Sequence, residues 1–170
     1  LDGLGLTPGA AVVQLARNSA EQFVLMAACY LGGFRSVTLQ PAVQSGEMLA
    51  ALAVRCRPEV ILVDSAFADR LGALRSRVEG VRCWCIVDAD DVSSFPWAGS
   101  EGESASRAGV ETVVRIGFTS GTTLGMPKAV LLSSRALGAL TLANLADGDW
   151  PDRPIVLVAE AMAGGLVNMI

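Results

Sequence analysis

Short apolar runs alternate with segments of helical periodicity along the first half of the chain. Strands that are buried on both faces of a parallel sheet read as brief runs rich in Val, Ile and Leu. Such runs predict strands at residues 10–15, 36–39, 60–63 and 81–87. Apolar residues at helical spacing predict helices at residues 18–31, 45–57 and 65–74. This alternation predicts an α/β fold with a largely parallel sheet and flanking helices.

Local signals indicate where these helices begin and end. Asn18 and Glu21 have the spacing of a capping box, and Gly32-Gly33 can terminate the helix that follows them. Ser65 is the expected cap of the third helix, because a serine hydroxyl can accept a hydrogen bond from the free amides of a first turn. We therefore expect Asn18 and Ser65 to be the capping residues.

The second half of the chain begins with a change of composition. Between 88 and 108 the sequence is rich in Asp, Ser, Gly and Glu and loses its hydrophobic periodicity, which is typical of a surface connection. Further strands are predicted at 112–118, 129–132 and 155–158, and a further helix at 135–145. The chain is therefore divided into strand-helix repeats (1–87), a surface connection (88–108) and a final region (109–170).

Composition narrows the possible classes of function. With 170 residues, 52% of them apolar and 18% charged, the chain has enough core material for one ordinary domain. Its apolar stretches are too short to cross a bilayer, and its first residues lack the basic head of a secretory signal, so a cytoplasmic protein is expected. A net charge of −4 without a basic run argues against nucleic acid as a partner.

Two residue types limit the catalytic chemistry. The sequence contains no histidine, which excludes a Ser-His-Asp or Cys-His mechanism within this chain and removes the commonest zinc ligand. The cysteines lack the spacing of a metal site or of a Cys-x-x-Cys pair. Reduced, structural thiols are therefore expected at Cys29, Cys56, Cys83 and Cys85.

One segment combines glycines, hydroxyls and a lysine between two predicted strands. Residues 118–128 read Phe-Thr-Ser-Gly-Thr-Thr-Leu-Gly-Met-Pro-Lys. Glycines let backbone N–H groups face an anion, hydroxyls donate further hydrogen bonds, and lysine adds a positive charge. The segment is either a phosphate-binding loop or a plain turn. The first is favoured because the segment is expected to join two buried strands at the ends of a parallel sheet, and not to close a solvated hairpin.

Two other nucleotide motifs fit less well. A Walker loop places its lysine at the start of a helix, whereas Lys128 follows Pro127 and opens a predicted strand. Gly3, Gly5 and Gly9 precede the first predicted strand, whereas the glycines of a dinucleotide fingerprint follow it. An unrelated Rossmann-like or flavodoxin-like domain is therefore the weakest alternative.

The loop and the residues after it resemble the signature of the adenylate-forming superfamily, which includes acyl-CoA synthetases, peptide-synthetase adenylation domains and luciferases. That signature reads aromatic-Thr-Ser-Gly-Thr-Thr-Gly-x-Pro-Lys-Gly-Val, two residues, then Ser-His-x-x-Leu. Here residues 118–128 are followed by Ala-Val-Leu-Leu-Ser-Ser-Arg-Ala-Leu. Upstream, Gly9, Val12 and residues 18–21 agree with the start of the family's domain. The resemblance covers residues 4–142 and implies part of the large amino-terminal domain of such an enzyme, without its carboxy-terminal domain.

The resemblance implies an ATP-dependent ligase that joins a carboxylic acid to AMP, releases pyrophosphate and passes the acyl group to a thiol such as coenzyme A. ATP and Mg²⁺ would be its cofactors, and a fatty or aromatic acid its substrate. It assigns to the β- and γ-phosphates the loop residues Thr119, Ser120, Gly121, Thr122, Thr123 and Gly125. It also makes Lys128 the catalytic cation that neutralises the leaving pyrophosphate, and Thr122 the residue on the metal side.

Several residues depart from the family signature. Leu124 is an extra residue after the threonine pair, Ala129 replaces a glycine, Ser134 replaces a histidine, and residues 161–165 lack an expected histidine. The family's metal-binding Glu, ribose-binding Asp and second catalytic lysine would have to come from the remainder of the enzyme as a partner. Two hypotheses follow: a ligase fragment that cannot complete adenylation alone, or a degenerate, non-catalytic nucleotide-binding or scaffold fragment of the same fold.

Overall fold

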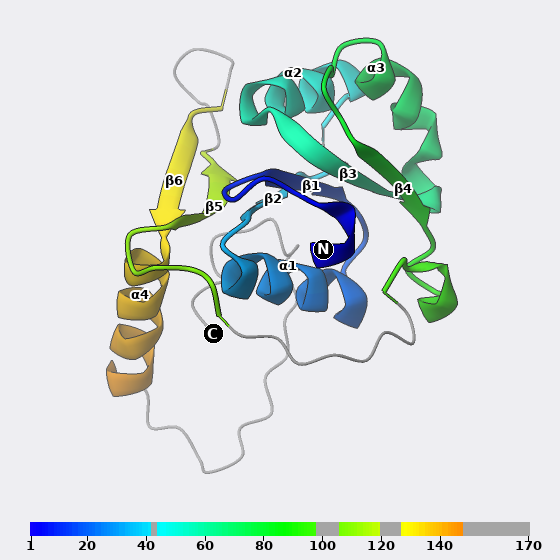
Figure 1. Cartoon of the computed structure of the whole chain (residues 1–170). Helices are drawn as coiled ribbons and strands as arrows, with labels where there is room; N and C mark the ends of the chain where they lie inside the picture. The colour runs from blue at the N-terminus through cyan, green and yellow to red at the C-terminus, as the bar shows by residue number, and fades with distance from the viewer. Residues whose placement is uncertain (42–43, 98–105, 120–126, 148–170) are drawn as a thin grey trace.

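The computed structural model describes residues 1–41, 44–97, 106–119 and 127–147 (Figure 1). The strands are β1 (Ala11–Leu15), β2 (Arg35–Thr38), β3 (Pro58–Asp64), β4 (Cys83–Val87), β5 (Val113–Phe118) and β6 (Ala129–Ser133). The α-helices are α1 (Ala20–Gly32), α2 (Gly46–Cys56), α3 (Leu71–Arg75) and α4 (Ser134–Asp147). Short 3-10 turns are η1 (Asp2–Leu4), η2 (Ser65–Arg70) and η3 (Val92–Ser94).

The described strands form one six-stranded sheet in the order β4-β3-β1-β2-β5-β6. Neighbouring strands from β4 to β5 run parallel, and β6 runs antiparallel to β5. Each parallel step from β1 to β2 and from β2 to β3 is made through a helix, because parallel strands cannot be joined by a tight turn. The predicted α/β fold with a largely parallel sheet is confirmed. The predicted strand at 155–158 lies outside the described residues.

Helices cover both faces of the sheet, with α1 on one side and α2 and α3 on the other (Figure 1). Successive strand residues point to opposite faces, so β1 and β3 contribute to two separate cores. On the α2 face, Leu52 packs with Val13 and Ile61. On the α1 face, Cys29 packs with Leu62. Every residue of β1 is buried, as the Val-rich run predicted.

Two helix caps differ from the prediction. Ser19, and not Asn18, caps α1, because its side chain accepts a hydrogen bond from the Gln22 amide at 3.1 Å. A cap must directly precede the first helical residue to reach the amides of the first turn, so the functional spacing is Ser19 to Gln22, one position later than expected. Asp64, and not Ser65, caps the turn after β3 by accepting from the Ala66 amide at 3.1 Å.

The region predicted as a surface connection contains one buried aromatic residue. Phe95 is 3% exposed and joins the core on the α1 face, where its ring lies 5.1 Å from that of Trp97. Residues 90–93, at the start of η3, are exposed. Residues 98–105 lie outside the described part of the chain, so the connection is described only at its two ends.

Candidate functional site

The two ends of the glycine- and threonine-rich segment lie side by side at the tip of β5 and β6. Phe118 pairs with Ala129 in the last register position of the antiparallel ladder. Beyond it, the Thr119 amide donates to the Lys128 carbonyl at 3.0 Å. In return, the Lys128 amide donates to Thr119 Oγ1 at 3.1 Å. These reciprocal hydrogen bonds bring Thr119 and Lys128, nine positions apart in sequence, to the base of one loop.

The strands that flank this loop form an antiparallel hairpin, whereas the sequence favoured two buried strands over a solvated hairpin. β5 and β6 pair antiparallel, and Ala129, Val130 and Leu131 are exposed. The expectation of a buried strand holds for the centre of β5 and was wrong for β6. An apolar run can also form the outer strand of a sheet, and among the described residues β6 has only β5 as a hydrogen-bonded neighbour. β5 is nevertheless parallel to β2, so the loop still begins at the carboxyl end of a parallel strand.

The described part of the predicted site consists of Thr119 and Lys128. Both residues are exposed, as access to a phosphate ligand requires. The Thr119 oxygen accepts a hydrogen bond from Lys128, so the hydroxyl hydrogen of Thr119 is left to donate elsewhere. The remaining predicted residues lie outside the described part of the chain: Ser120, Gly121, Thr122, Thr123 and Gly125.

An arginine from a distant element contacts both sides of the loop base, and the sequence analysis did not find it. Arg55, in the last turn of α2, donates from Nη1 to the Pro127 carbonyl at 2.6 Å. Its guanidinium also lies 6.0 Å from the centre of the Phe118 ring. Arg55 and Pro127 are 72 positions apart, and an isolated arginine in a helix gives no signal of such a contact.

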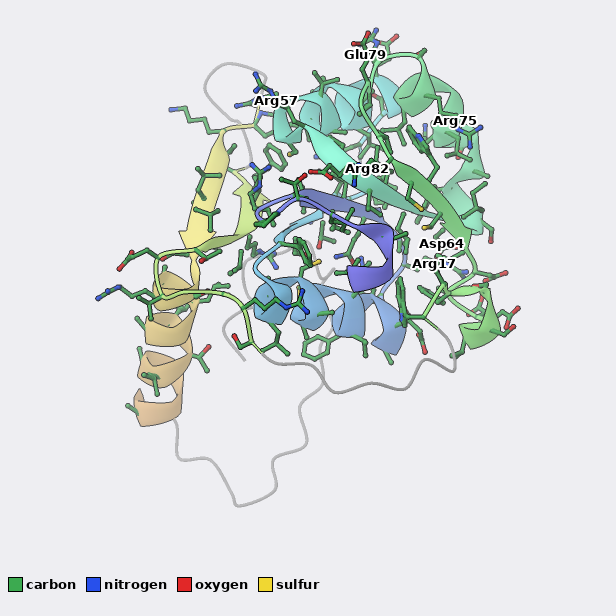
Figure 2. The ribbon with its side chains drawn as sticks, viewed as in Figure 1. Arg17, Arg57, Asp64, Arg75, Glu79 and Arg82 are labelled. Carbon is green, nitrogen blue, oxygen red and sulfur yellow. The ribbon has the colours of Figure 1, made fainter. Side chains whose placement is uncertain are left out.

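Positive charge gathers at this end of the molecule. Arg57 follows α2 and precedes β3, and Figure 2 shows it on the side where β6 begins. Arg55 and Lys128 belong to the same side, since Arg55 binds the carbonyl that precedes Lys128. Such a group of cations favours an anionic ligand at the loop.

A second polar cluster lies at the opposite end of β3 (Figure 2). Arg17 donates from Nε to the buried Asp64 at 2.8 Å, from Nη2 to Asp88 at 3.0 Å and from Nη1 to Asp90 at 2.7 Å. Burial alone would raise the pKa of Asp64, but hydrogen bonds from Arg17 and from backbone amides hold it below its usual value. Hydrogen bonds to Asp64 and Asp90 raise the pKa of Arg17. The cluster joins the ends of β1, β3 and β4 and has a structural role.

The cysteines are free thiols, as predicted. Burial raises the pKa of Cys29 to about 12 and that of Cys56 to about 11, which keeps both protonated. Burial and the neighbouring Cys83 raise the pKa of Cys85 to about 12. Within the described ranges, no three Cys, Asp or Glu side chains gather in a way that could hold a metal ion, and Thr122, the predicted metal-side residue, lies outside them. None of the described helices has the length and hydropathy needed to cross a membrane.

Residues 1–163 match the family described as AMP-binding enzyme. The chain belongs to the AMP-binding enzyme family. This membership confirms the resemblance that the loop signature and the upstream residues indicated.

Proteins that resemble this chain in sequence or in fold are consistent with this family. The chain is 32% identical over 159 residues to 4-coumarate–CoA ligase 1 of Oryza sativa subsp. japonica, covering 88% of this chain and 28% of that protein. The solved amino-terminal domain of FACL13 from Mycobacterium tuberculosis matches with a TM-score of 0.77 and 21% identity, covering 95% of this chain and 40% of that one. ATP-bound MatB from Rhodopseudomonas palustris matches with a TM-score of 0.72 and 25% identity, covering 86% of this chain and 29% of that one.

The chain corresponds to a limited part of these proteins. It spans about a quarter of the length of the plant ligase that it matches. The structural likeness confirms the expected amino-terminal domain fold of adenylate-forming enzymes. Family and fold are thereby established for the region that contains the loop.

Proposed function

We propose that the protein takes part in ATP-dependent activation of a carboxylic acid, forming an acyl-adenylate and releasing pyrophosphate. The observation that carries the proposal is the family match over residues 1–163, which includes the whole Gly- and Thr-rich loop. The hydrogen bonds that bring Thr119 and Lys128 together at the loop base support it. In this proposal the loop holds the β- and γ-phosphates while the carboxylate attacks the α-phosphorus.

Each loop residue has a defined part in the proposal. The Lys128 ammonium balances the charge that accumulates on pyrophosphate as it leaves. Thr119 donates its hydroxyl hydrogen to a phosphate oxygen, while its oxygen accepts from the Lys128 amide. Ser120, Gly121, Thr122, Thr123 and Gly125 supply further hydroxyl and amide donors. Thr122 would be the residue that holds the Mg²⁺ accompanying ATP, and that ion would neutralise part of the phosphate charge.

The acid and the acyl acceptor are proposed as classes. Because the named sequence relative is a 4-coumarate–CoA ligase and a named structural relative is ATP-bound MatB, coenzyme A is the proposed acceptor and ATP the nucleotide. Aromatic acids and fatty acids are the two classes to compare. The metal-binding Glu, the ribose-binding Asp and the second catalytic lysine of the family would come from the remainder of the enzyme.

ATP binding tests the proposal most directly. Residues 1–170 should bind ATP, and Lys128→Met should weaken that binding about tenfold through the loss of a charge-assisted contact. Arg75→Ala removes one cation at another place and should leave ATP binding unchanged. Equal affinity of the wild type and Lys128→Met for ATP would contradict the role of the loop.

Pyrophosphate exchange tests which part of the reaction this chain performs. With ATP and a panel of aromatic and fatty acids, residues 1–170 alone should give no ATP–pyrophosphate exchange, because the second catalytic lysine is missing. Exchange by this chain alone would refute the need for the remainder of the enzyme. In a complete enzyme, the acid that supports exchange identifies the substrate class.

A non-catalytic, nucleotide-binding or scaffold protein of the same fold is the second candidate function. The extra Leu124 and the substitution Ala129 for glycine favour it, because both change a loop that must direct consecutive amides at one anion. Deleting Leu124 separates the two candidates. If the loop is an altered phosphate site, the deletion should strengthen ATP binding, and an unchanged affinity would indicate another role for the loop.

A further inference from the structure

We infer that Arg55 is a positioning residue for Lys128: from helix α2 it fixes the peptide group that precedes Lys128, and so the direction in which the lysine side chain leaves the loop. The inference rests on the proposed function in one respect, which is that Lys128 binds phosphate. It adds a residue from outside the signature, 72 positions away from the loop. The inference is supported by the contacts of Arg55 with Pro127 and Phe118 and by the packing of α2 into the core.

The peptide group between Pro127 and Lys128 is held from both sides. Its carbonyl accepts from Arg55 Nη1 at 2.6 Å, and its N–H donates to Thr119 Oγ1 at 3.1 Å. Because a peptide group is planar, two opposed hydrogen bonds fix the orientation of that plane. The Lys128 carbonyl accepts in turn from the Thr119 amide at 3.0 Å. The backbone on both sides of the Lys128 Cα is therefore fixed.

Arg55 also contacts the opposite strand of the hairpin. Its guanidinium lies 6.0 Å from the centre of the Phe118 ring, within the range of a cation–π contact. Phe118 directly precedes Thr119, and Pro127 directly precedes Lys128. One guanidinium thus contacts the residue before each end of the loop, which sets how the two ends lie relative to α2.

The backbone of Arg55 is itself well anchored. Its helical neighbours Leu52, Ala53 and Cys56 are at most 2% exposed and pack into the core on the α2 face. A cation in the last turn of a helix is also favoured by the helix dipole. The hairpin, in contrast, exposes Val130 and Leu131 at its outer strand. Arg55 therefore connects an exposed hairpin to a rigid helix at the position where the loop needs a fixed direction.

Nucleotide binding gives the first test. Arg55→Ala should weaken ATP binding about tenfold, the loss of one charged hydrogen bond, and leave AMP binding unchanged, because AMP lacks the phosphates that Lys128 contacts. Arg75→Ala is the matched control: Arg75 carries the same charge and lies 5.4 Å from the Trp84 ring, but none of its described contacts reaches the loop. Equal losses for ATP and AMP would overturn the inference, because they would indicate general destabilisation.

A double-mutant cycle decides whether Arg55 acts through Lys128. If it does, Arg55→Ala should cause no further loss of ATP affinity in the Lys128→Met background, because there is no ammonium left to position. Additive losses would show that Arg55 acts by its own charge, and would overturn the inference.

Amide hydrogen exchange tests the same point without nucleotide. In the nucleotide-free protein, Arg55→Ala should speed exchange of the Lys128 and Thr119 amides, and Arg75→Ala should not. Unchanged exchange at both amides would overturn the inference. If the wild type failed to bind ATP while Arg55→Ala still raised this exchange, the proposed function would fail and the positioning role would stand.

Discussion

Strands β3 and β6 have similar apolar sequences and opposite surroundings. β3 reads Pro-Glu-Val-Ile-Leu-Val-Asp, and all its residues except Glu59 are buried. β6 reads Ala-Val-Leu-Leu-Ser, and its first three residues are exposed, Leu131 by 60%. Composition therefore does not tell a central strand from an outer one. The neighbours that the topology supplies decide how much of each strand is buried.

The two regions also differ in how their ends are fixed. β3 lies between β1 and β4 under helices α2 and α3, and at its carboxyl end the buried Asp64 receives hydrogen bonds from Arg17 and two backbone amides. The β5–β6 hairpin is held at its tip by Thr119, Lys128 and the single guanidinium of Arg55. Loops that carry function are commonly placed at such less stable ends of a rigid scaffold.

The largest contrast is expected from truncating one apolar residue in each strand. Ile61→Ala removes a fully buried side chain of β3 and should lower the free energy of unfolding by about 2 to 5 kcal/mol, through lost burial and a residual cavity. Leu131→Ala in β6 should change it by no more than about 0.5 kcal/mol. Denaturant unfolding of both variants measures the difference. Comparable losses would mean that β6 is as buried as β3 in solution.

The second effect concerns the carboxylate at the end of β3. Asp64→Ala should destabilise the protein by about 3 kcal/mol, because the buried Asp64 carboxylate accepts from the amides of Arg17 and Ala66 and from the Arg17 side chain. Asp90→Ala, which removes an exposed carboxylate bound to the same guanidinium, should have a small effect. Urea unfolding measures the free energy of unfolding of both variants. Equal losses of stability would contradict the view that Asp64 is the carboxylate that holds this cluster together.

These contrasts show which parts of the structure could be predicted from the sequence. The first parallel strands were predicted because short Val-rich runs have few other stable positions in an α/β fold, and β1 was placed within one residue. The strand order and the β6 hairpin were not predicted, because a periodic pattern carries no information about which strands are neighbours. The caps were misplaced by one residue, since several adjacent polar residues can each serve as a cap.

The candidate site was predictable only where local chemistry defines it. Glycines, threonines and Lys128 at fixed spacing indicate phosphate binding within one segment of sequence. Arg55 could not be found in the same way, because its contact with Pro127 depends on how α2 packs on the sheet. The Arg17 cluster likewise brings together residues up to 73 positions apart. Side-chain contacts between residues that are far apart in the sequence therefore cannot be predicted from the sequence pattern.

A smaller effect is expected from acidification. The folded-state pKa of Asp64 is lowered, so its stabilisation is fully present above the ordinary carboxyl pKa of about 4 and is lost as pH falls through the lowered value. The stability difference between the wild type and Asp64→Asn should therefore shrink as pH falls below about 4. Unfolding curves of both proteins across this range measure it. A difference that stays constant with pH would show that the Asp64 charge does not contribute.

The smallest effect on global stability is expected at the hairpin tip. Thr119→Val keeps the shape of the side chain but removes the oxygen that accepts from the Lys128 amide. Because both residues are exposed, the free energy of unfolding should change by less than about 0.5 kcal/mol. Exchange of the Lys128 amide should nevertheless become about fivefold faster, which corresponds to one lost hydrogen bond of about 1 kcal/mol.

Thr119→Ser separates the hydroxyl from the rest of the side chain. Serine keeps the acceptor, so exchange of the Lys128 amide should stay close to that of the wild type, whereas Thr119→Val raises it. If Thr119→Val left the exchange unchanged, the hydrogen bond would not hold the Lys128 backbone in solution, and Arg55 would be its main support. If the valine variant instead lost as much global stability as Ile61→Ala, the hairpin would belong to the same cooperative unit as the β3 core, and the contrast between the two regions would not hold.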